Sequence, residues 1–365
     1  MKPPRQFKGR YGYTTGACAT AALKAALLLL TGREEKEVRV RLPIGWEAAF
    51  PLKDCSLNGE KARASVIKDA GDDPDVTNGA EIRVEVALAP GHGKIIFRAG
   101  EGVGVVTKPG LGIPVGEPAI SSVPRRMMRE VVEEVLGEKL KDLNVCVTIS
   151  IPQGEELAKH TLNARLGIKG GLSILGTKGI VIPFSTAAYK ASIVKAFHVA
   201  RALGITEVVL TTGGRSELCC QRLFPDLPEE AFVQVGDFVG FSLRSARRNG
   251  FQRITLGMML GKMAKIAVGL SNTHAKYGDV PLAELLSWAK ESGAPEGALR
   301  KLKEAHTARR FLEILKEKAP GILETFSRRV CEEALEAARK FTGEHVRLRA
   351  VLLDFGGEAL AIVER

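Results

Sequence analysis

Hydrophobic and polar positions follow two different patterns along this chain. Between residues 38 and 106, short runs rich in β-branched residues are separated by Gly, Pro, Asn and Asp, which is typical of strands joined by turns. Apolar residues suited to helices precede these runs at 17–30 and follow them at 124–136. We therefore expect an α+β N-terminal domain with a mostly antiparallel sheet packed on the first helix. Its predicted strands cover 38–42, 47–52, 62–67, 81–89, 94–100 and 145–151.

From about residue 180, continuous apolar runs alternate with amphipathic helical segments, and two strands close the chain. This alternation indicates a parallel sheet covered by helices on both faces. We expect an α+β domain at 1–165 and an α/β domain with a largely parallel, doubly wound sheet at 175–365, with a junction within 151–180. The predicted elements of the second domain are strands at 179–184, 207–212, 231–235 and 253–258, and helices at 186–203, 215–224, 238–249, 259–269 and within 281–342.

The first candidate for chemistry is the start of the first helix. Thr14 or Thr15 can cap this helix, and Gly16 leaves the backbone of its first turn bare. Bare N–H groups at a helix start bind anions, because the helix dipole adds to the hydrogen bonds. The alternative is an ordinary capped helix without a ligand.

Two more candidate segments follow strands of the predicted parallel sheet. In such sheets, ligands bind beyond the carboxyl ends of the strands. The first segment, Thr211-Thr212-Gly213-Gly214-Arg215-Ser216, can hold a carboxylate or phosphate on backbone N–H groups at a helix start. The second contains Asp237, at an offset similar to that of the acid that binds ribose in dinucleotide folds. Together they suggest an adenosine-containing ligand, although Asp237 could instead cap the helix at 238–249.

A third segment follows the strand at 253–258 and is basic. Lys262 and Lys265 lie one helical turn apart and form either a clamp for carboxylates or a solvated helix face. His274 follows them and is either a structural or surface residue or a proton acceptor.

The amino-acid composition bears on whether the protein binds a metal, a nucleic acid or a small anionic substrate. The six cysteines contain no C-x-x-C pair and the six histidines are scattered, so we expect no protein-bound metal. The net charge of +11 favours an anionic partner. Only 5% of the residues are aromatic and no nucleic-acid-binding signature is present, so a small polyanionic substrate fits at least as well as nucleic acid.

The apolar stretch at 17–30, preceded by basic residues within 2–10, has some features of a secretory signal. Lys24 interrupts it, and residues 31–37 offer no small-residue cleavage site. No other run approaches the roughly 20 apolar residues that span a bilayer. We therefore expect a cytoplasmic protein that does not bind membranes.

Taken together, many segments resemble one family. Residues ~10–280 match densely, and the remainder weakly, the order of motifs in the CbiD-type cobalt-precorrin-5B C(1)-methyltransferases of anaerobic cobalamin biosynthesis. The segments that carry the resemblance are GYTTGACATAALKAAL, KDAGDDPDVTNGAEI, GVGVVTKPGL, GEPAI, ISIPQGEELAKHTLNARLGI, GGLSILGTKGIV, LTTGGRSE, GDFVGF and GKMAKIAVGLSNTHAK.

The resemblance implies S-adenosylmethionine as methyl donor and an anionic, cobalt-containing tetrapyrrole as acceptor, with the metal carried by the substrate. It also implies a fold unlike the usual glycine-motif methyltransferases, and it leaves room for a homo-oligomer or for contacts with other pathway enzymes. On this hypothesis the first domain contacts the substrate and the second binds the donor. The predicted donor-binding residues are Thr211, Thr212, Gly213, Gly214, Arg215, Ser216 and Asp237. The predicted substrate-binding residues are Thr14, Thr15, Gly16, Lys108, Arg125, Lys262 and Lys265, and the candidate proton acceptors are Asp69 and His274.

Two other functional classes stay open at this point. A basic nucleic-acid-binding protein would use the positive charge directly. A nicotinamide-dependent dehydrogenase would use the same kind of sheet, but the G-x-G-x-x-G turn that such enzymes carry is missing.

Overall fold

The computed structural model describes residues 9–365, so the basic residues 2–8 considered above lie outside the described part. The chain divides into two compact units, Met1–Thr186 and Ala187–Arg365. Both units contain helices and sheets, so the prediction of a mixed architecture of helices and strands is confirmed. No helix in the described part is both long and apolar enough to cross a membrane.

The main sheet of the first unit has five strands in the order β4-β5-β6-β9-β7. Neighbours from β4 to β9 are antiparallel, but β7 runs parallel to β9, so the sheet is mixed. The parallel pair arises because a long crossover containing α2 carries the chain back to the same end of the sheet. The strands are β4 (Asp54–Asn58), β5 (Lys61–Ile67), β6 (Glu81–Pro90), β7 (Ile95–Ala99) and β9 (Leu143–Ser150), and the helix is α2 (Ser122–Leu136). The sequence prediction missed β4.

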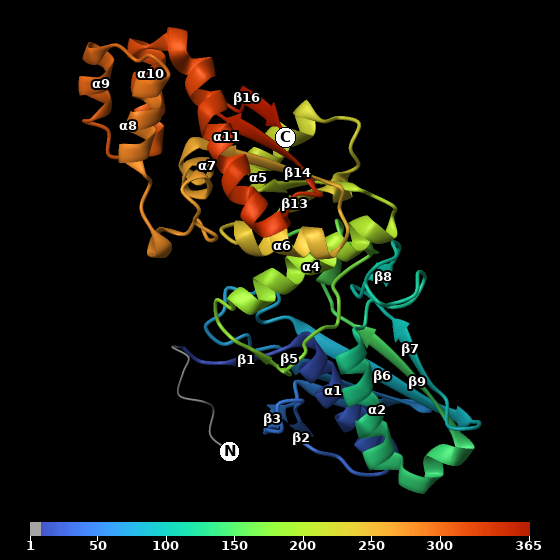
Figure 1. The fold of residues 1–365 in the computed structure, drawn as a ribbon. Coiled ribbons are helices and arrows are strands. Elements are labelled where there is room, and N and C mark those ends of the chain that lie inside the picture. Colours follow the sequence, from blue (N-terminus) through green and yellow to red (C-terminus); the bar gives the residue numbers. More distant parts are fainter. Residues whose placement is uncertain (1–8) are drawn as a thin grey trace. The chain divides into compact units, whose positions relative to one another are not determined.

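Helix α1 (Thr15–Leu30) packs against β5 and β6 on one side and against α2 on another (Figure 1). The helix is rich in alanine, and nearly all of its residues are buried. The strand residues that face it alternate along β5 and β6, as in a sheet with one face in the core. Small side chains let the helix backbone lie close to the sheet, which explains why its pattern is apolar all round.

Short strand pairs complete the first unit. β1 (Gly12–Tyr13) pairs with β11 (Ile180–Val181), so the segment 179–184 is not the first strand of the parallel sheet, as predicted, but a two-residue partner of the N-terminal segment. The apolar run alone predicted a buried strand of the parallel sheet, but the contacts of this segment with β1 determine its structure. The other short elements are β2 (Glu37–Arg41), β3 (Glu47–Pro51), β8 (Val105–Val106), η1 (Gly137–Asp142), α3 (Gly154–Ala158) and β10 (Ile168–Lys169).

Two distant backbone segments cross at the N-terminus of the first unit. The Tyr13 N–H donates to the Asp69 carbonyl at 2.7 Å, and the Asp72 N–H donates to the Arg10 carbonyl at 3.0 Å. A Cβ on Gly12 would lie 2.0 Å from the Ala70 carbonyl carbon, so no side chain fits at this crossing.

The sheet of the second unit has the order β13-β12-β14-β15-β16. The first four strands are parallel, and β16 runs antiparallel to β15 at the edge. The strands are β12 (Glu207–Thr211), β13 (Phe232–Gln234), β14 (Arg253–Met259), β15 (Arg347–Leu353) and β16 (Ala359–Glu364).

Apolar residues on both faces of this sheet are buried. Val209 and Val351 belong to a core with Cys219 and Cys220 of α5 (Gly214–Leu223). Neighbouring strand residues such as Leu210 belong to a larger core with residues of the other α-helices. These helices are α4 (Thr186–Ala202), α6 (Val239–Arg248), α7 (Leu260–Ala267), α8 (Leu282–Glu291), α9 (Glu296–Leu302), α10 (Ala308–Lys318) and α11 (Leu323–Thr342). The short 3-10 helices of this unit are η2 (Glu229–Ala231), η3 (Ala275–Tyr277) and η4 (Pro320–Ile322).

Candidate functional site

The strand order of the second unit creates one distinctive position at the carboxyl edge of the sheet. After β12 the chain passes through α5 to β13 on one side, and then through α6 to β14 on the other side of β12. The order therefore reverses at β12. Ligands of open α/β sheets bind at such a switch point, because the loops on either side leave the sheet in opposite directions.

The turn Thr211–Ser216 follows β12 at this edge. The Ser216 hydroxyl donates to the Gly213 carbonyl at 2.9 Å and accepts from the Gly213 N–H at 3.3 Å, which fixes the start of α5. A Cβ on Gly213 would meet no atom within 4 Å, so the space over the turn is open. Arg215 is exposed and makes no ion pair with the described residues.

Thr211 adds an unusual feature at the base of this turn. Its side chain is fully buried, and its Oγ1 has no hydrogen-bond partner among the described residues. Buried hydroxyl groups are nearly always hydrogen-bonded, because an unpaired one costs about 1–3 kcal/mol. This hydroxyl is buried within the unit, so it is not open to a ligand in this structure.

Asp237 lies beyond the neighbouring strand β13 and gathers a polar cluster. Its Oδ1 accepts from the Thr273 hydroxyl at 2.7 Å and forms an ion pair with Lys262. Lys265 donates to the Thr273 carbonyl at 3.1 Å, and Lys262 to the same oxygen at 3.3 Å. No described residue bonds to Asp237 Oδ2, which stays available on a side chain that is 27% exposed. This set of four residues is called the Asp237 cluster below.

The contacts of the cluster bear on the structural alternatives for Asp237 and the two lysines, and ligand binding by these residues stays a prediction. Asp237 does not cap α6, whose N-cap is Phe238 without a side-chain hydrogen bond. Lys265 does not lie on a solvated face, because its side chain is buried, whereas Lys262 is partly exposed. Both ammonium groups reach the Thr273 carbonyl.

The charge state of Asp237 follows from these contacts. Burial opposes ionisation of the carboxyl, but hydrogen bonds from Lys262 and Thr273 and the charge of Lys262 together lower its pKa. Asp237 is therefore ionised at neutral pH and can accept hydrogen bonds from hydroxyl groups.

Thr273 and Tyr189 belong to this neighbourhood and were not predicted. Thr273 is fully buried, and its N–H donates to the Asp237 carbonyl at 3.0 Å. Tyr189 of α4 has its pKa raised by burial and then by the charge of Asp237, which places the phenol near the carboxylate. Thr273 lies within the segment GKMAKIAVGLSNTHAK that carries the resemblance, but no role of its own was predicted for it. Tyr189 lies in no such segment, and only the tertiary structure brings both residues to Asp237.

His274 follows the cluster and lies in a turn. Its Nδ1 accepts from the Lys276 N–H at 3.0 Å, and its own N–H donates to Asn272 Oδ1 at 3.0 Å. The residue is exposed, so only Nε2 of its ring is left for another partner.

The start of α1 differs from the prediction of an open anion site. The Gly16 N–H donates to the Leu175 carbonyl at 3.0 Å, and the Ala17 N–H donates to Thr14 Oγ1 at 3.2 Å. Thr15 binds the same loop through its hydroxyl, with the Leu175 N–H donating to it at 3.0 Å. Since the chain's own loop occupies these N–H groups, Thr14, Thr15 and Gly16 form a capped and covered helix start in this structure.

The predicted residues Asp69 and Arg125 are also engaged within the first unit. Hydrogen bonds from Arg10 and from the Gly71 N–H lower the pKa of Asp69, which makes its carboxylate a weak proton acceptor. Arg125 donates to the carbonyls of Ile120 and Pro118 and pairs with Glu117 at 3.2 Å.

Lys108 is half-buried, and Gly167 lies directly against its side chain. Asp69, Lys108 and Arg125 lie in the first unit. The residues predicted to bind the methyl donor, and both lysines of the Asp237 cluster, lie in the second unit.

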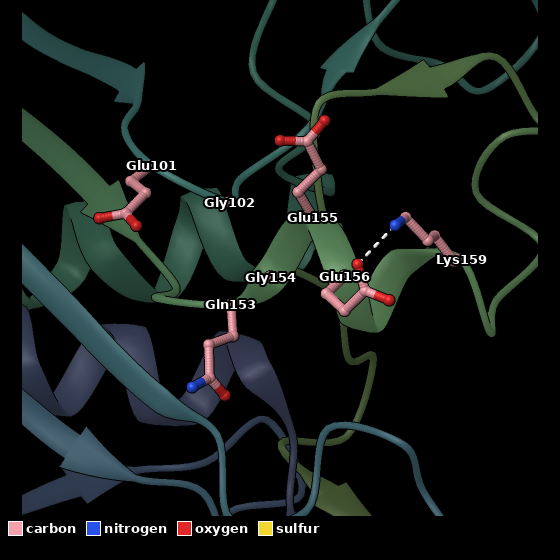
Figure 2. A pocket seen from close by; sticks show the side chains of 7 residues that line it. All are labelled: Glu101, Gly102, Gln153, Gly154, Glu155, Glu156 and Lys159. Atoms are coloured by element: carbon pink, nitrogen blue, oxygen red, sulfur yellow. Dashed lines mark hydrogen bonds and ion pairs between the residues drawn. The ribbon is translucent and has the colours of Figure 1, made fainter.

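The first unit also has a hollow of about 400 Å³ next to α3 (Figure 2). Glu101, Glu155 and Glu156 surround it, and Lys159 pairs with Glu156. Three carboxylates against one paired lysine repel an anionic ligand, so this hollow does not suit a polycarboxylate substrate. Among residues 9–365, no group of three or more His, Cys, Asp or Glu side chains is placed to hold a metal ion.

The parallel strands and the switch at β12 place the second unit in the class of α/β proteins with a largely parallel sheet. Comparison with known proteins then identifies the family. The CbiD family model matches residues 2–183, and the model of the CbiD C-terminal domain matches residues 272–364. The chain belongs to the CbiD family, which confirms the resemblance seen in its motifs.

Curated relatives match nearly the whole chain. A cobalt-precorrin-5B C(1)-methyltransferase of Thermus thermophilus is 51% identical over 98% of this chain and 96% of its own length. The protein of that name from Priestia megaterium is 47% identical over 98% and 97%. A crystal structure of a cobalamin biosynthesis protein (cbiD) from Archaeoglobus fulgidus is 26% identical, covers 85% of this chain and 84% of that chain, and has a TM-score of 0.39.

Proposed function

We propose that the protein transfers a methyl group from S-adenosylmethionine to carbon 1 of cobalt-precorrin-5B, giving cobalt-precorrin-6A in anaerobic cobalamin biosynthesis. The observation that carries this proposal is the 51% identity over 98% of the chain to a protein named for this reaction. The relatives support neither a nucleic-acid-binding protein nor a nicotinamide-dependent dehydrogenase.

The second unit is proposed as a doubly wound donor-binding domain, and its residues fit a nucleoside with a carboxylate tail. The open space over Gly213 suits the donor's amino-acid group. Asp237 Oδ2 would accept from the ribose hydroxyls, as an acid does after the second strand of nucleotide-binding βαβ units. Lys262 and Thr273 keep that carboxylate ionised and fixed in direction.

The donor supplies a methyl group on a sulfonium centre, which an electron-rich ring carbon of the acceptor can take directly. The protein's part is to align the two molecules and to exclude water, since no covalent enzyme intermediate is required. Thr212, Gly214, Arg215 and Ser216 would orient the donor from the turn, and Lys265 would hold Thr273 in place.

The first unit is proposed to contact the acceptor, with Lys108 as a partner for one of its carboxylates. Arg125 is given a positioning role, because its guanidinium already donates to Ile120, Pro118 and Glu117. Asp69 and His274 stay candidates for accepting a proton, and the lowered pKa of Asp69 favours His274. The cobalt belongs to the substrate, so the proposal includes no protein-bound metal.

We place the protein in the cytoplasm because its six cysteines are all free. Free buried thiols such as Cys18, Cys220 and Cys331 are typical of a reducing compartment.

An anaerobic incubation with S-adenosylmethionine and cobalt-precorrin-5B tests the proposed reaction. Mass spectrometry should detect the gain of one methyl group on the acceptor, dependent on both components and on the enzyme. Binding of the donor without methylation would show that the acceptor is wrong. Absence of donor binding would reject the adenosine site and the proposed reaction together.

A further inference from the structure

Tyr189 of α4 lies beside the turn that carries Asp237. A Cβ on Gly236 would be 3.0 Å from the Tyr189 hydroxyl and 3.4 Å from a ring carbon, so the phenol occupies the space where a side chain at 236 would stand. Gly236 also has a φ of 53°, which favours glycine. The Tyr189 ring is thus fixed against the backbone that presents Asp237.

The Tyr189 ring packs against a second aromatic side chain. Its centroid is 5.5 Å from that of Phe238, at an interplanar angle of 43°. Lys190 lies 5.0 Å from the centroid of Phe238 and 5.3 Å from that of Phe241, so the other aromatic rings of this neighbourhood already have a cation over them. Tyr189 itself is 41% exposed, which leaves part of its ring open to a ligand.

The chemistry of the proposed donor fits this ring. In a nucleoside bound through its ribose, the base extends beyond the ribose and away from the turn that holds the tail. Here the tail turn follows β12 and the acid follows β13, so the base would lie near the side chains that flank Asp237. Adenine is flat and uncharged, and it stacks well on an aromatic ring.

We infer that Tyr189 is the side chain on which the adenine of the donor stacks. This inference rests on the proposed function, since it assigns a further residue to the same donor site. The ring carries the interaction, whereas the hydroxyl lies over Gly236 and keeps the ring in place.

Titration calorimetry with S-adenosylhomocysteine, the stable product of the donor, tests the inference on the full-length protein. Tyr189→Ala should weaken binding about tenfold or more, because the adenine loses the aromatic ring on which it stacks. Tyr189→Phe keeps the aromatic ring, so its dissociation constant for S-adenosylhomocysteine should lie within about threefold of the wild-type value.

Leu203→Ala is the matched control, because Leu203 directly follows the same helix and is equally exposed at 41%. It should leave binding unchanged. In the methylation assay, Tyr189→Ala should raise the KM for the donor and leave the KM for the acceptor as it is, a separation that a general loss of structure would not produce.

The outcomes separate the inference from the proposed function. If wild-type protein fails to bind S-adenosylhomocysteine, the donor site itself is rejected. If the wild type binds and Tyr189→Ala binds equally well, the stacking role is overturned while the proposed function stands. If Tyr189→Phe is as weak as Tyr189→Ala, the hydroxyl and not the ring makes the contact, which also overturns the inference.

Discussion

At the scale of single residues, the Asp237 cluster shows how far side-chain chemistry follows from sequence. Asp237 was predicted to hold a ribose from its offset to Gly213, and Lys262 and Lys265 were predicted to bind substrate carboxylates. In the structure all three contact Thr273, and their contacts with a ligand stay predictions. Sequence spacing could not reveal this, because the link depends on a threonine in a loop that has no periodic pattern.

Asp237→Asn is predicted to weaken binding of S-adenosylhomocysteine by about 1.5–3 kcal/mol, the range for a hydrogen bond to a charged group. The fold should survive, because Lys262 is 37% exposed and can be solvated when its partner loses charge. Asp226→Asn is the control, since Asp226 is an exposed aspartate in the same unit. Equal binding by wild type and Asp237→Asn in calorimetry would remove Asp237 from the donor site.

At the scale of elements, the periodicity of apolar residues predicted most of the helices and the longer strands. The segments 207–212, 238–249 and 253–258 became β12, α6 and β14 with small shifts of their ends. The pairing of strands was predicted less well. β7 runs parallel to β9, because the crossover through α2 connects them, and the segment 179–184 pairs with β1. Such choices depend on contacts between distant residues, which local patterns do not contain.

The start of α1 leads to a prediction about packing. Gly16→Ala should destabilise the protein by about 1–3 kcal/mol, the usual cost of overpacking. The reason is that the added Cβ would lie 2.6 Å from Pro124 and 3.0 Å from the Leu175 carbonyl oxygen. Urea unfolding measures the change.

Gly297→Ala in α9 is the matched control for this substitution. No atom lies within 4 Å of the added Cβ, so the change should be neutral or stabilising by up to about 1 kcal/mol. A Gly16→Ala variant as stable as the wild type would contradict the packing described here.

The loop after β5 contains a buried ion pair with a testable dependence on pH. Lys68 is 1% exposed and donates to Asp75 at 2.7 Å. Burial raises the pKa of Asp75, but hydrogen bonds from Lys68 and Thr77 outweigh it and lower the pKa below its ordinary value of 3.8. The stabilisation from this group is therefore complete above about pH 3.8 and is lost as the pH falls through the lower folded-state pKa.

Asp75→Asn should destabilise the protein by about 3–5 kcal/mol at pH 7, because it leaves the buried ammonium of Lys68 without its carboxylate. The difference from the wild type should shrink as the pH falls below the ordinary carboxyl pKa. Urea unfolding at a series of pH values measures it. Lys68→Met combined with Asp75→Asn should recover much of the loss at pH 7, and a difference that is constant with pH would exclude the ion pair as its cause.

At the scale of the whole molecule, the charge of +11 has a consequence for the two substrates. We predict that the KM for the polyanionic acceptor rises severalfold as salt is increased, because added ions screen attraction beyond about 10 Å at 0.1 M. The KM for the donor, which carries a single net positive charge, should change far less than that for the acceptor. Steady-state kinetics at several salt concentrations tests this, and parallel changes in both constants would contradict it.

The crossing of the N-terminal segment has a consequence for synthesis of the protein. Tyr13 pairs with Ile180, and the Thr14 N–H donates to the Gly179 carbonyl, so contacts of the first residues are made with residues more than 160 positions later. Tyr13 can contact Asp69 early, but β1 cannot pair with β11 until nearly the whole first unit has been synthesised. Closing such a long loop is slow. The β1–β11 pair is therefore among the last contacts of the first unit to form during synthesis.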